Sequence, residues 1–373
     1  MTADVGVGHT SAAKALRNAL ALSTPDLEST IVDSYKFSAA MFSRVVSNGY
    51  LGLVKTIPQM YRFIYARAEK ATDVGPFRAW VHQFTASNIR PFLTQYAPDV
   101  VVCTHAFPCG VMAEYKHEFA DAPPVFGVVT DFAVHAFWIH ANVDGYAVAT
   151  DQMRQQLIAR GVDPQRIVAS GIPISPEFGE TSRGRDQLAR RLELPPDRRI
   201  VLVMGGGLGI APLETIMRAL AQVDDSLCAV VIVGRSRRAE ARALECAARM
   251  QYPVRVLRFV DNVHDYMHAA DLLVTKPGGL TSSEALAAGV PLLLFKPLPG
   301  QEERNTRFLV SGGAAVRAKK SEDLAQRVQM LLRDVQKRER MRVAMAALAK
   351  PNAAADAAAA IRRVAGARGE RIA

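Results

Sequence analysis

The stretch Lys276–Asn305, KPGGLTSSEALAAGVPLLLFKPLPGQEERN, carries the strongest signal about the fold. The run Asp271–Thr275 before it predicts a strand, two glycines expose the backbone, and Ser282–Ala288 has helical spacing. A helix N-terminus placed there points amide N–H groups and the positive end of its dipole at an anion. Glu284 lies where a carboxylate could accept hydrogen bonds from ribose hydroxyls. Thr281-x-x-Glu284 also fits a capping box, which needs no ligand.

The alternation of strands and helices continues on both sides of this stretch. In the second half, strands are predicted at Ile200–Met204, Ala229–Val233, Val254–Phe259, Asp271–Thr275, Pro291–Lys296 and Ala314–Arg317. In the first half, they are predicted at Ser29–Asp33, Asp99–Cys103, Pro124–Val129 and Asp144–Ala149. Helical segments between most of these strands predict an α/β fold with parallel sheets covered on both faces.

The length of the chain predicts two domains. A chain of 373 residues and 40.5 kDa is too long for one α/β core of ordinary size. Prolines in Gly171–Pro196 predict a linker at 173–196, between an N-terminal domain at 1–172 and a C-terminal domain at 197–373. Ala353–Val364 predicts a terminal helix, which we expect to pack back on the N-terminal domain.

The net charge of +10 and the pI of about 9.6 favour a polyanionic partner, such as nucleic acid, an anionic membrane or a phosphorylated ligand. A merely basic surface is the alternative, and no nucleic-acid recognition motif is present. The four cysteines have no metal-ligand spacing and are typical of reduced thiols in the cytoplasm. No apolar run reaches the roughly 18 residues of a transmembrane helix, and no secretory signal pattern begins the sequence.

A glycine turn near the N-terminus opens an apolar-striped helix in Gly6–Leu16, GVGHTSAAKAL. His9 falls in the first helical turn, where an imidazole can accept a proton. The alternative is a dinucleotide-binding turn with Asp33 as the ribose acid, although Ser11 replaces the third glycine. Because only five residues precede the turn, too few for an ordinary strand, we expect the natural start to lie upstream.

Two further loops follow predicted strands. Gly205–Gly209, GGGLG, suits a phosphate or simply a tight turn. Gln301 and Glu302 open a predicted helix, and their amide and carboxylate groups match the donors and acceptors of sugar hydroxyls. A solvated acidic first turn, favoured by the helix dipole, is the alternative.

Two segments of the first half are candidates for acceptor binding. Asp131, His135 and Trp138 follow a strand, at the edge where α/β sheets bind ligands. A zinc site lacks a third and fourth ligand, so no metal is predicted. Tyr35–Lys70 combines aromatic residues with cations, which suits an anionic bilayer surface or a buried amphipathic hairpin.

Together these segments resemble one family, the diacylglycerol glycosyltransferases, which include plant-type monogalactosyldiacylglycerol synthases and bacterial processive diacylglycerol glucosyltransferases. The resemblance covers nearly the whole chain and is carried by GVGHTSAAKAL, VVTDFAVHAFW, SGIPISPEF and KPGGLTSSEALAAGVPLLLFKPLPGQEERN. It implies the GT-B fold, with two doubly wound Rossmann-like domains that face each other across a cleft. The second half is also similar, more distantly, to the transferase that adds N-acetylglucosamine to the lipid-linked peptidoglycan precursor.

The resemblance also implies roles for individual residues. It makes His9 the catalytic base. It places a UDP-sugar on a donor set formed by Gly206, Gly207, Phe259, Val260, Gly278, Gly279, Glu284, Gln301 and Glu302. Within that set the glycines approach the diphosphate, Phe259 and Val260 border uracil, Glu284 takes the ribose, and Gln301 and Glu302 take the sugar. It places the acceptor or membrane near Asp131, His135, Trp138, Phe42 and Tyr61.

The predicted function is inverting transfer of a hexose from a UDP-sugar to a membrane lipid such as 1,2-diacylglycerol, without a metal or cofactor. The enzyme is expected on the inner face of the cell membrane, bound peripherally to its anionic surface. Four alternatives remain: an N-acetylglucosamine transferase acting on a lipid-linked precursor, a nucleotide-sugar epimerase, an NAD-dependent enzyme, and a basic nucleic-acid-binding module. The residues do not distinguish glucose, galactose and N-acetylglucosamine.

Overall fold

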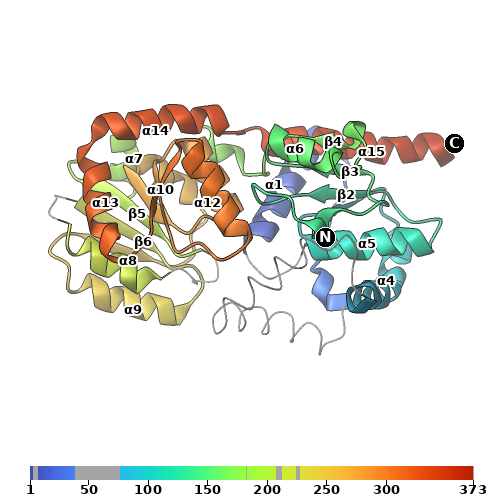
Figure 1. Cartoon of the computed structure of the whole chain (residues 1–373), viewed down its shortest axis with the longest axis horizontal. Coiled ribbons are helices and arrows are strands. Elements are labelled where there is room, and N and C mark those ends of the chain that lie inside the picture. The colour runs from blue at the N-terminus through green and yellow to red at the C-terminus, as the bar shows by residue number, and fades with distance from the viewer. Residues whose placement is uncertain (3–6, 38–75, 182, 207–211, 224–226, 373) are drawn as a thin grey trace. The chain divides into compact units, whose positions relative to one another are not determined.

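The computed structural model describes residues 1–2, 7–37, 76–181, 183–206, 212–223 and 227–372 (Figure 1). The chain forms two compact units. Unit 1 comprises Met1–Ile174, Pro299–Gln301 and Asn352–Ala373, and unit 2 comprises Ser175–Leu298 and Glu302–Pro351. The boundary therefore follows Ile174. Most of the segment 173–196, predicted as a linker, belongs to unit 2.

The sheet of unit 1 is parallel, in the order β1-β2-β3-β4. Its strands are β1 (Val101–Cys103), β2 (Val125–Val128), β3 (Gly145–Ala147) and β4 (Ile167–Val168). The first three lie inside predicted strands, whereas β4 was not predicted. Its two residues are too few to show a period-2 pattern.

The first two residues extend this sheet beyond β1. Thr2 forms a parallel bridge with Asp33, and its N–H donates to the carbonyl of Val32 at 2.9 Å. On the other side, the N–H of Thr104 donates to the carbonyl of Met1 at 3.0 Å. Residues 1–2 thus lie between 32–34 and 102–104. The predicted strand Ser29–Asp33 is reduced to this single bridge.

The helices of unit 1 include one from the far end of the sequence. α15 (Ala353–Ile372) packs against α1 (Val7–Ser23) and β3. Small side chains on α15, such as the fully buried Ala357, let it approach Phe126 and Val128 of the sheet closely. The described residues of the unit also form η1 (Ser34–Phe37), α4 (Pro76–Tyr96), α5 (Ala106–Glu118), η2 (Ala136–Trp138), α6 (Asp151–Ile158) and η3 (Pro164–Arg166).

The sheet of unit 2 is also parallel, in the order β10-β9-β8-β5-β6-β7. All six strands predicted for the second half are present: β5 (Arg199–Met204), β6 (Leu227–Ile232), β7 (Val254–Leu257), β8 (Leu272–Thr275), β9 (Leu292–Phe295) and β10 (Ala315–Ala318). The strand order reverses between β5 and β8. In open α/β sheets, ligands bind beyond the carboxyl ends of the strands at such a switch point.

Helices cover this sheet on both faces. α8 (Leu213–Leu220), α9 (Arg237–Ala247) and α13 (Glu322–Arg333) share one apolar core with β5, β6, β8 and β9, and Figure 1 shows these three helices grouped together. The unit is completed by η4 (Pro176–Phe178), α7 (Arg185–Arg191), α10 (Val263–Ala269), α11 (Gly279–Ala288), α12 (Gln301–Ser311) and α14 (Val335–Leu348).

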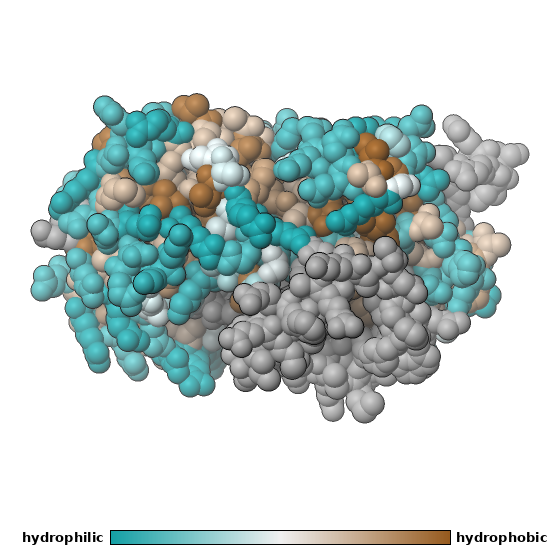
Figure 2. Space-filling model, in the orientation of Figure 1, coloured by the Kyte–Doolittle hydropathy of each residue, from teal (hydrophilic) through white to brown (hydrophobic). Residues whose placement is uncertain are grey.

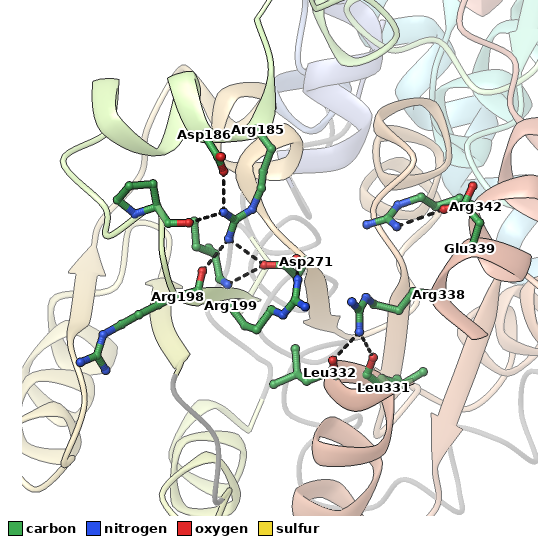
Figure 3. Close-up of polar contacts among 12 residues, drawn as sticks. Arg185, Asp186, Arg198, Arg199, Asp271, Leu331, Leu332, Arg338, Glu339 and Arg342 are labelled. Carbon is green, nitrogen blue, oxygen red and sulfur yellow. Dashed lines mark hydrogen bonds and ion pairs between the residues drawn. The ribbon is translucent and has the colours of Figure 1, made fainter. Parts of the chain in front are cut away.

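A buried carboxylate attaches α7 to the amino-terminal edge of the sheet (Figure 3). Asp271 has a side chain only 7% exposed, and it accepts hydrogen bonds from the N–H of Ile200 at 2.8 Å and from Arg185 at 2.9 Å. Arg199 approaches its other oxygen at 3.3 Å. These contacts explain why the segment after Ser175 belongs to unit 2.

The face of unit 2 drawn in Figure 2 is largely hydrophilic. Among the residues that the structure describes, no helix combines the length and the apolar character that crossing a bilayer requires.

Candidate active site

In unit 1, His9 meets two threonines at the carboxyl edge of the sheet. His9 lies in the first turn of α1, Thr104 follows β1, and Thr130 follows β2. Nδ1 of His9 lies 3.0 Å from the carbonyl oxygen of Thr104 and 2.9 Å from Oγ1 of Thr130. The Thr104 hydroxyl donates in turn to the His9 carbonyl at 3.0 Å. The imidazole is therefore held by the loops that follow two neighbouring strands.

These contacts select the tautomer of His9. A carbonyl oxygen only accepts, so the short contact with Thr104 requires the proton on Nδ1. Nε2 then keeps its lone pair. This nitrogen can accept a proton, as a general base must.

His9 belongs to a group of imidazoles that the structure keeps neutral. Burial lowers the pKa of His9 to about 4, against the smaller opposing effect of the Thr104 carbonyl. The His105 ring lies 4.6 Å from that of His9, and its Nδ1 accepts the N–H of Phe107 at 3.1 Å. Burial, followed by the effects of His9 and His135, holds the pKa of His105 well below its usual range.

Two of the residues predicted to bind the acceptor are buried in unit 1. His135 precedes η2 and is 5% exposed, and Trp138 in η2 is 2% exposed. The carbonyl of Trp138 accepts the hydroxyl of Tyr146 at 2.8 Å. Trp138 thus packs within the unit, while Asp131 is half-buried. Phe42 and Tyr61 lie outside the described residues.

In unit 2, three loops meet where the strand order reverses. They follow β5, β8 and β9, which are adjacent in the sheet. The Thr275 hydroxyl donates to the carbonyl of Met204 at 3.1 Å and ties the ends of β8 and β5 together. The predicted Gly206, Gly278 and Glu302 all lie on these loops or at the start of the helices after them.

The glycines leave the backbone open. Gly278 precedes α11, and a Cβ placed on it would meet nothing within 4 Å. Gly279 is the first residue of α11, so the helix N-terminus begins at this turn. Gly206 has a φ of +72°, which favours glycine. Gly207 lies outside the described residues.

Glu284 does not act as a helix cap. The N-cap of α11 is Gly278, so Thr281 lies within the helix and the capping box is not formed. Burial raises the pKa of the Glu284 carboxyl to about 7. A carboxyl whose pKa is shifted this far by burial is a functional-site candidate.

The structure gives Glu302 partners that the sequence analysis did not expect. Gln301 and Glu302 open α12, as predicted, but Glu302 forms an ion pair with Lys276. Its second oxygen accepts the N–H of Leu298 at 2.8 Å. The sequence analysis did not predict a role for Lys276, although it is the first residue of the stretch Lys276–Asn305 that gave the strongest signal about the fold.

Phe259 follows β7 and is 43% exposed, and Val260 after it is half-buried. The guanidinium of Arg235, which follows β6, lies 5.0 Å from the centre of the Phe259 ring. A cation stacked on an exposed ring at this edge was not anticipated. Across the described ranges, no cluster of three or more His, Cys, Asp and Glu side chains is arranged to hold a metal ion.

Comparisons with known proteins cover both units. Residues 9–174 match the family described as monogalactosyldiacylglycerol (MGDG) synthase, and residues 184–348 match glycosyl transferases group 1. The processive diacylglycerol beta-glucosyltransferase of Bacillus subtilis (strain 168) is 32% identical over 346 residues, 92% of this chain and 88% of the relative. That of Bacillus licheniformis is 31% identical with the same coverage.

The chain belongs to the diacylglycerol glycosyltransferase family.

Solved structures extend the family's fold to more distant proteins. MurG of Acinetobacter baumannii is 19% identical, with a TM-score of 0.57 over 76% of this chain and 79% of that one. The co-structure of S. aureus MnaA with UDP is 13% identical, with a TM-score of 0.64 over 95% of this chain and 92% of that one. At such identities the likeness concerns the fold alone. Two parallel α/β units and these neighbours confirm the GT-B class predicted for this family member.

Proposed function

We propose that the protein transfers a hexose from a UDP-sugar to diacylglycerol, with inversion at the anomeric carbon. The observation that carries the proposal is the 3.0 Å contact between Nδ1 of His9 and the Thr104 carbonyl, which leaves Nε2 as a proton acceptor at the carboxyl edge of unit 1. The curated relatives in Bacillus are named for glucosyl transfer to diacylglycerol. A neighbour at 14% identity has been solved in complex with UDP-glucose.

In the proposed reaction, the acceptor hydroxyl oxygen attacks the anomeric carbon while its proton passes to Nε2 of His9. The bond between that carbon and the β-phosphate oxygen breaks, and its electron pair leaves with UDP. Burial disfavours the charged form of His9, so the imidazole is unprotonated before the reaction, and the position of Nε2 supports its role as the base. The Thr104 carbonyl would stabilise the imidazolium by accepting a hydrogen bond from its Nδ1–H.

The donor would bind unit 2 at the switch point between β5 and β8. The open turn at Gly278 and the N-terminus of α11 provide amide groups for the diphosphate. Glu284, in the second turn of the same helix, would take the ribose hydroxyls. We propose that these groups act without a metal or cofactor, because the protein itself supplies positive potential to the leaving group.

We also propose that the enzyme binds peripherally to the inner, anionic face of the cell membrane. The net charge of +10 supports this proposal, since each basic group near an anionic surface contributes roughly 1 kcal/mol. Sedimentation with anionic and with neutral vesicles tests it. Equal partitioning into both would contradict electrostatic docking.

The function is tested by incubating the full chain with diacylglycerol vesicles and UDP-glucose, UDP-galactose or UDP-N-acetylglucosamine in turn, followed by mass spectrometry of the lipids. We expect a glycosylated lipid with one of the three donors, with one UDP released for each hexose transferred. A parallel reaction without lipid checks for epimerisation. Conversion of the UDP-sugar to its epimer, with no glycolipid in the full reaction, would overturn the proposal.

A further inference from the structure

Lys276 lies at the switch point between β5 and β8 of unit 2, where we propose that the donor binds. It follows β8 directly, and its side chain is 20% exposed. A Cβ placed on Gly206 would lie 3.1 Å from Cε of Lys276, so the lysine side chain passes over the backbone of the glycine turn after β5. The ammonium therefore lies between the two loops of the switch point.

Glu302 holds this ammonium in place. Its side chain is 10% exposed, and one carboxylate oxygen accepts from Nζ of Lys276. The other oxygen accepts the N–H of Leu298 at 2.8 Å. Both oxygens are engaged within unit 2, which is the arrangement of a counterion.

The helix that carries Glu302 is itself fixed to the loop that carries Lys276. The side-chain amide of Asn305, which is fully buried, donates to the carbonyl of Pro277 at 3.0 Å. The Thr306 hydroxyl donates to the carbonyl of Glu302 at 2.7 Å. Taking a lysine and a glutamate out of water costs free energy, and a hydrophobic pair often gives equal or greater stability. Stability alone does not explain the ion pair.

We propose that the Lys276 ammonium contacts the diphosphate of the donor, and that Glu302 is a positioning residue that holds Lys276 there. The inference rests on the proposed function, because it assigns a role within the same transfer. An ammonium has three N–H donors, of which Glu302 takes one. As the bond to the anomeric carbon breaks, charge accumulates on the β-phosphate oxygens, and a fixed cation stabilises that charge.

The first test measures the binding of UDP and of uridine to the Lys276→Met variant by calorimetry. Methionine keeps most of the side-chain volume and removes the charge. We expect UDP affinity to fall about 10- to 100-fold, the range for losing a hydrogen bond to a charged group, and uridine affinity to stay within twofold. Lys319→Met, which removes the same charge from an exposed position of unit 2, should bind both as the wild type does.

Comparing UDP with uridine distinguishes a direct contact between Lys276 and the diphosphate from a structural role of Lys276 in its loop. A lysine that only supports the fold of the loop would lower the affinity for UDP and for uridine equally. That result, or UDP affinity equal to that of wild type, would overturn the assignment.

The second test addresses Glu302 by a double-mutant cycle with Glu302→Gln and Lys276→Met. If Glu302 is a counterion, Glu302→Gln should change the affinities for UDP and for UDP-glucose by the same factor, and this factor should disappear in the Lys276→Met background. If Glu302 instead binds the sugar, the loss of affinity should be confined to UDP-glucose. That loss, an equal effect in both backgrounds, or no effect at all would contradict the positioning role.

These outcomes are distinct from those of the transfer assay. A wild-type protein that binds UDP but forms no glycolipid would refute the proposed function and leave the contact between Lys276 and UDP to be judged by the first test. A wild-type protein that forms glycolipid, with a Lys276→Met variant that binds UDP normally, would refute only the present inference.

Discussion

At the scale of single residues, the chemistry of the candidate site depends on side chains whose charge the fold has altered. His9 is kept neutral by burial and oriented by two threonines. Glu284 is kept partly protonated at neutral pH by the same physical cause. Burial disfavours the charged form of each group, which lowers the pKa of the base and raises that of the acid.

Replacement of His9 should affect the transfer step. We expect His9→Ala to lower kcat by about 10²- to 10⁴-fold, the usual contribution of a general base, with UDP affinity unchanged. Thr130→Val, which removes one partner of Nδ1 while Thr104 keeps the other, should cost much less. Steady-state kinetics with diacylglycerol vesicles measures both variants. A His9→Ala enzyme with near-wild-type turnover would show that another group takes the proton.

The pH dependence of UDP binding should report Glu284. Hydrogen bonds from ribose favour the ionised carboxylate, so the bound form has a pKa below the value of about 7 in the free protein. UDP affinity should therefore rise with pH toward a plateau above pH 7, with a proton released on binding near pH 6. Calorimetry in buffers of different ionisation enthalpy measures that proton.

Glu284→Gln provides the control, because it keeps the shape and removes the titration. The pH dependence of UDP affinity that remains in this variant comes from the ionisation of UDP itself and serves as the background. We expect the slope of affinity against pH to become shallower, and the affinity at pH 8 to fall about 10-fold or more. Identical pH profiles in both proteins would show that Glu284 does not contact the ribose.

At the scale of elements, the attachment of α7 to the sheet depends on one carboxylate. Asp271 partners Arg185, Arg199 and the N–H of Ile200 (Figure 3). We expect Asp271→Ala to lower the free energy of unfolding by about 1–3 kcal/mol, because it leaves the buried N–H of Ile200 without its partner and removes the ion pairs with Arg185 and Arg199. Urea denaturation measures the change.

Asp186→Ala is the matched control. Asp186 also pairs with Arg185, at 2.8 Å, but its side chain is 61% exposed. Exposed ion pairs contribute only about 0–1 kcal/mol, so this variant should unfold close to wild type. An equal decrease in the free energy of unfolding in both variants would mean that burial does not determine how much each ion pair with Arg185 contributes to stability.

At the scale of the whole molecule, the end of the chain belongs to the unit that contains its beginning. α15 follows unit 2 in sequence but packs on α1 and β3 in unit 1. Ile361 of α15 is 1% exposed in that core. We expect Ile361→Ala to destabilise unit 1 by about 2–5 kcal/mol through loss of apolar contacts and the cavity left behind.

Hydrogen exchange resolves this effect by unit. Amides of β2 and β3 should exchange faster in Ile361→Ala, whereas those of β5 and β6 should not change. Arg363→Ala, at an exposed position two residues further along α15, should leave both sheets as in wild type. Faster exchange in unit 2 would contradict the assignment of α15 to unit 1 alone.

Local patterns along the chain were enough to predict several parts of this protein. Six apolar runs of unit 2 are strands because four to six adjacent β-forming residues suffice to specify each one. The glycine turns and the start of α11 followed from the same reasoning. The spacing of apolar residues and the residues of a turn depend only on neighbours in the sequence, so both can be predicted without knowing the fold.

The pairs of side chains that meet could not be predicted before the fold was known. Lys276 and Glu302 are 26 positions apart, Arg185 and Asp271 are 86, and His9 and Thr104 are 95. Lys276 meets Glu302, and His9 meets Thr104, because the order of parallel strands brings distant segments to the carboxyl edge of a sheet, whereas Arg185 meets Asp271 at the amino-terminal edge of the unit 2 sheet. Burial within each unit then shifts the pKa values of His9 and Glu284, which is why their charge was not apparent from the residues alone.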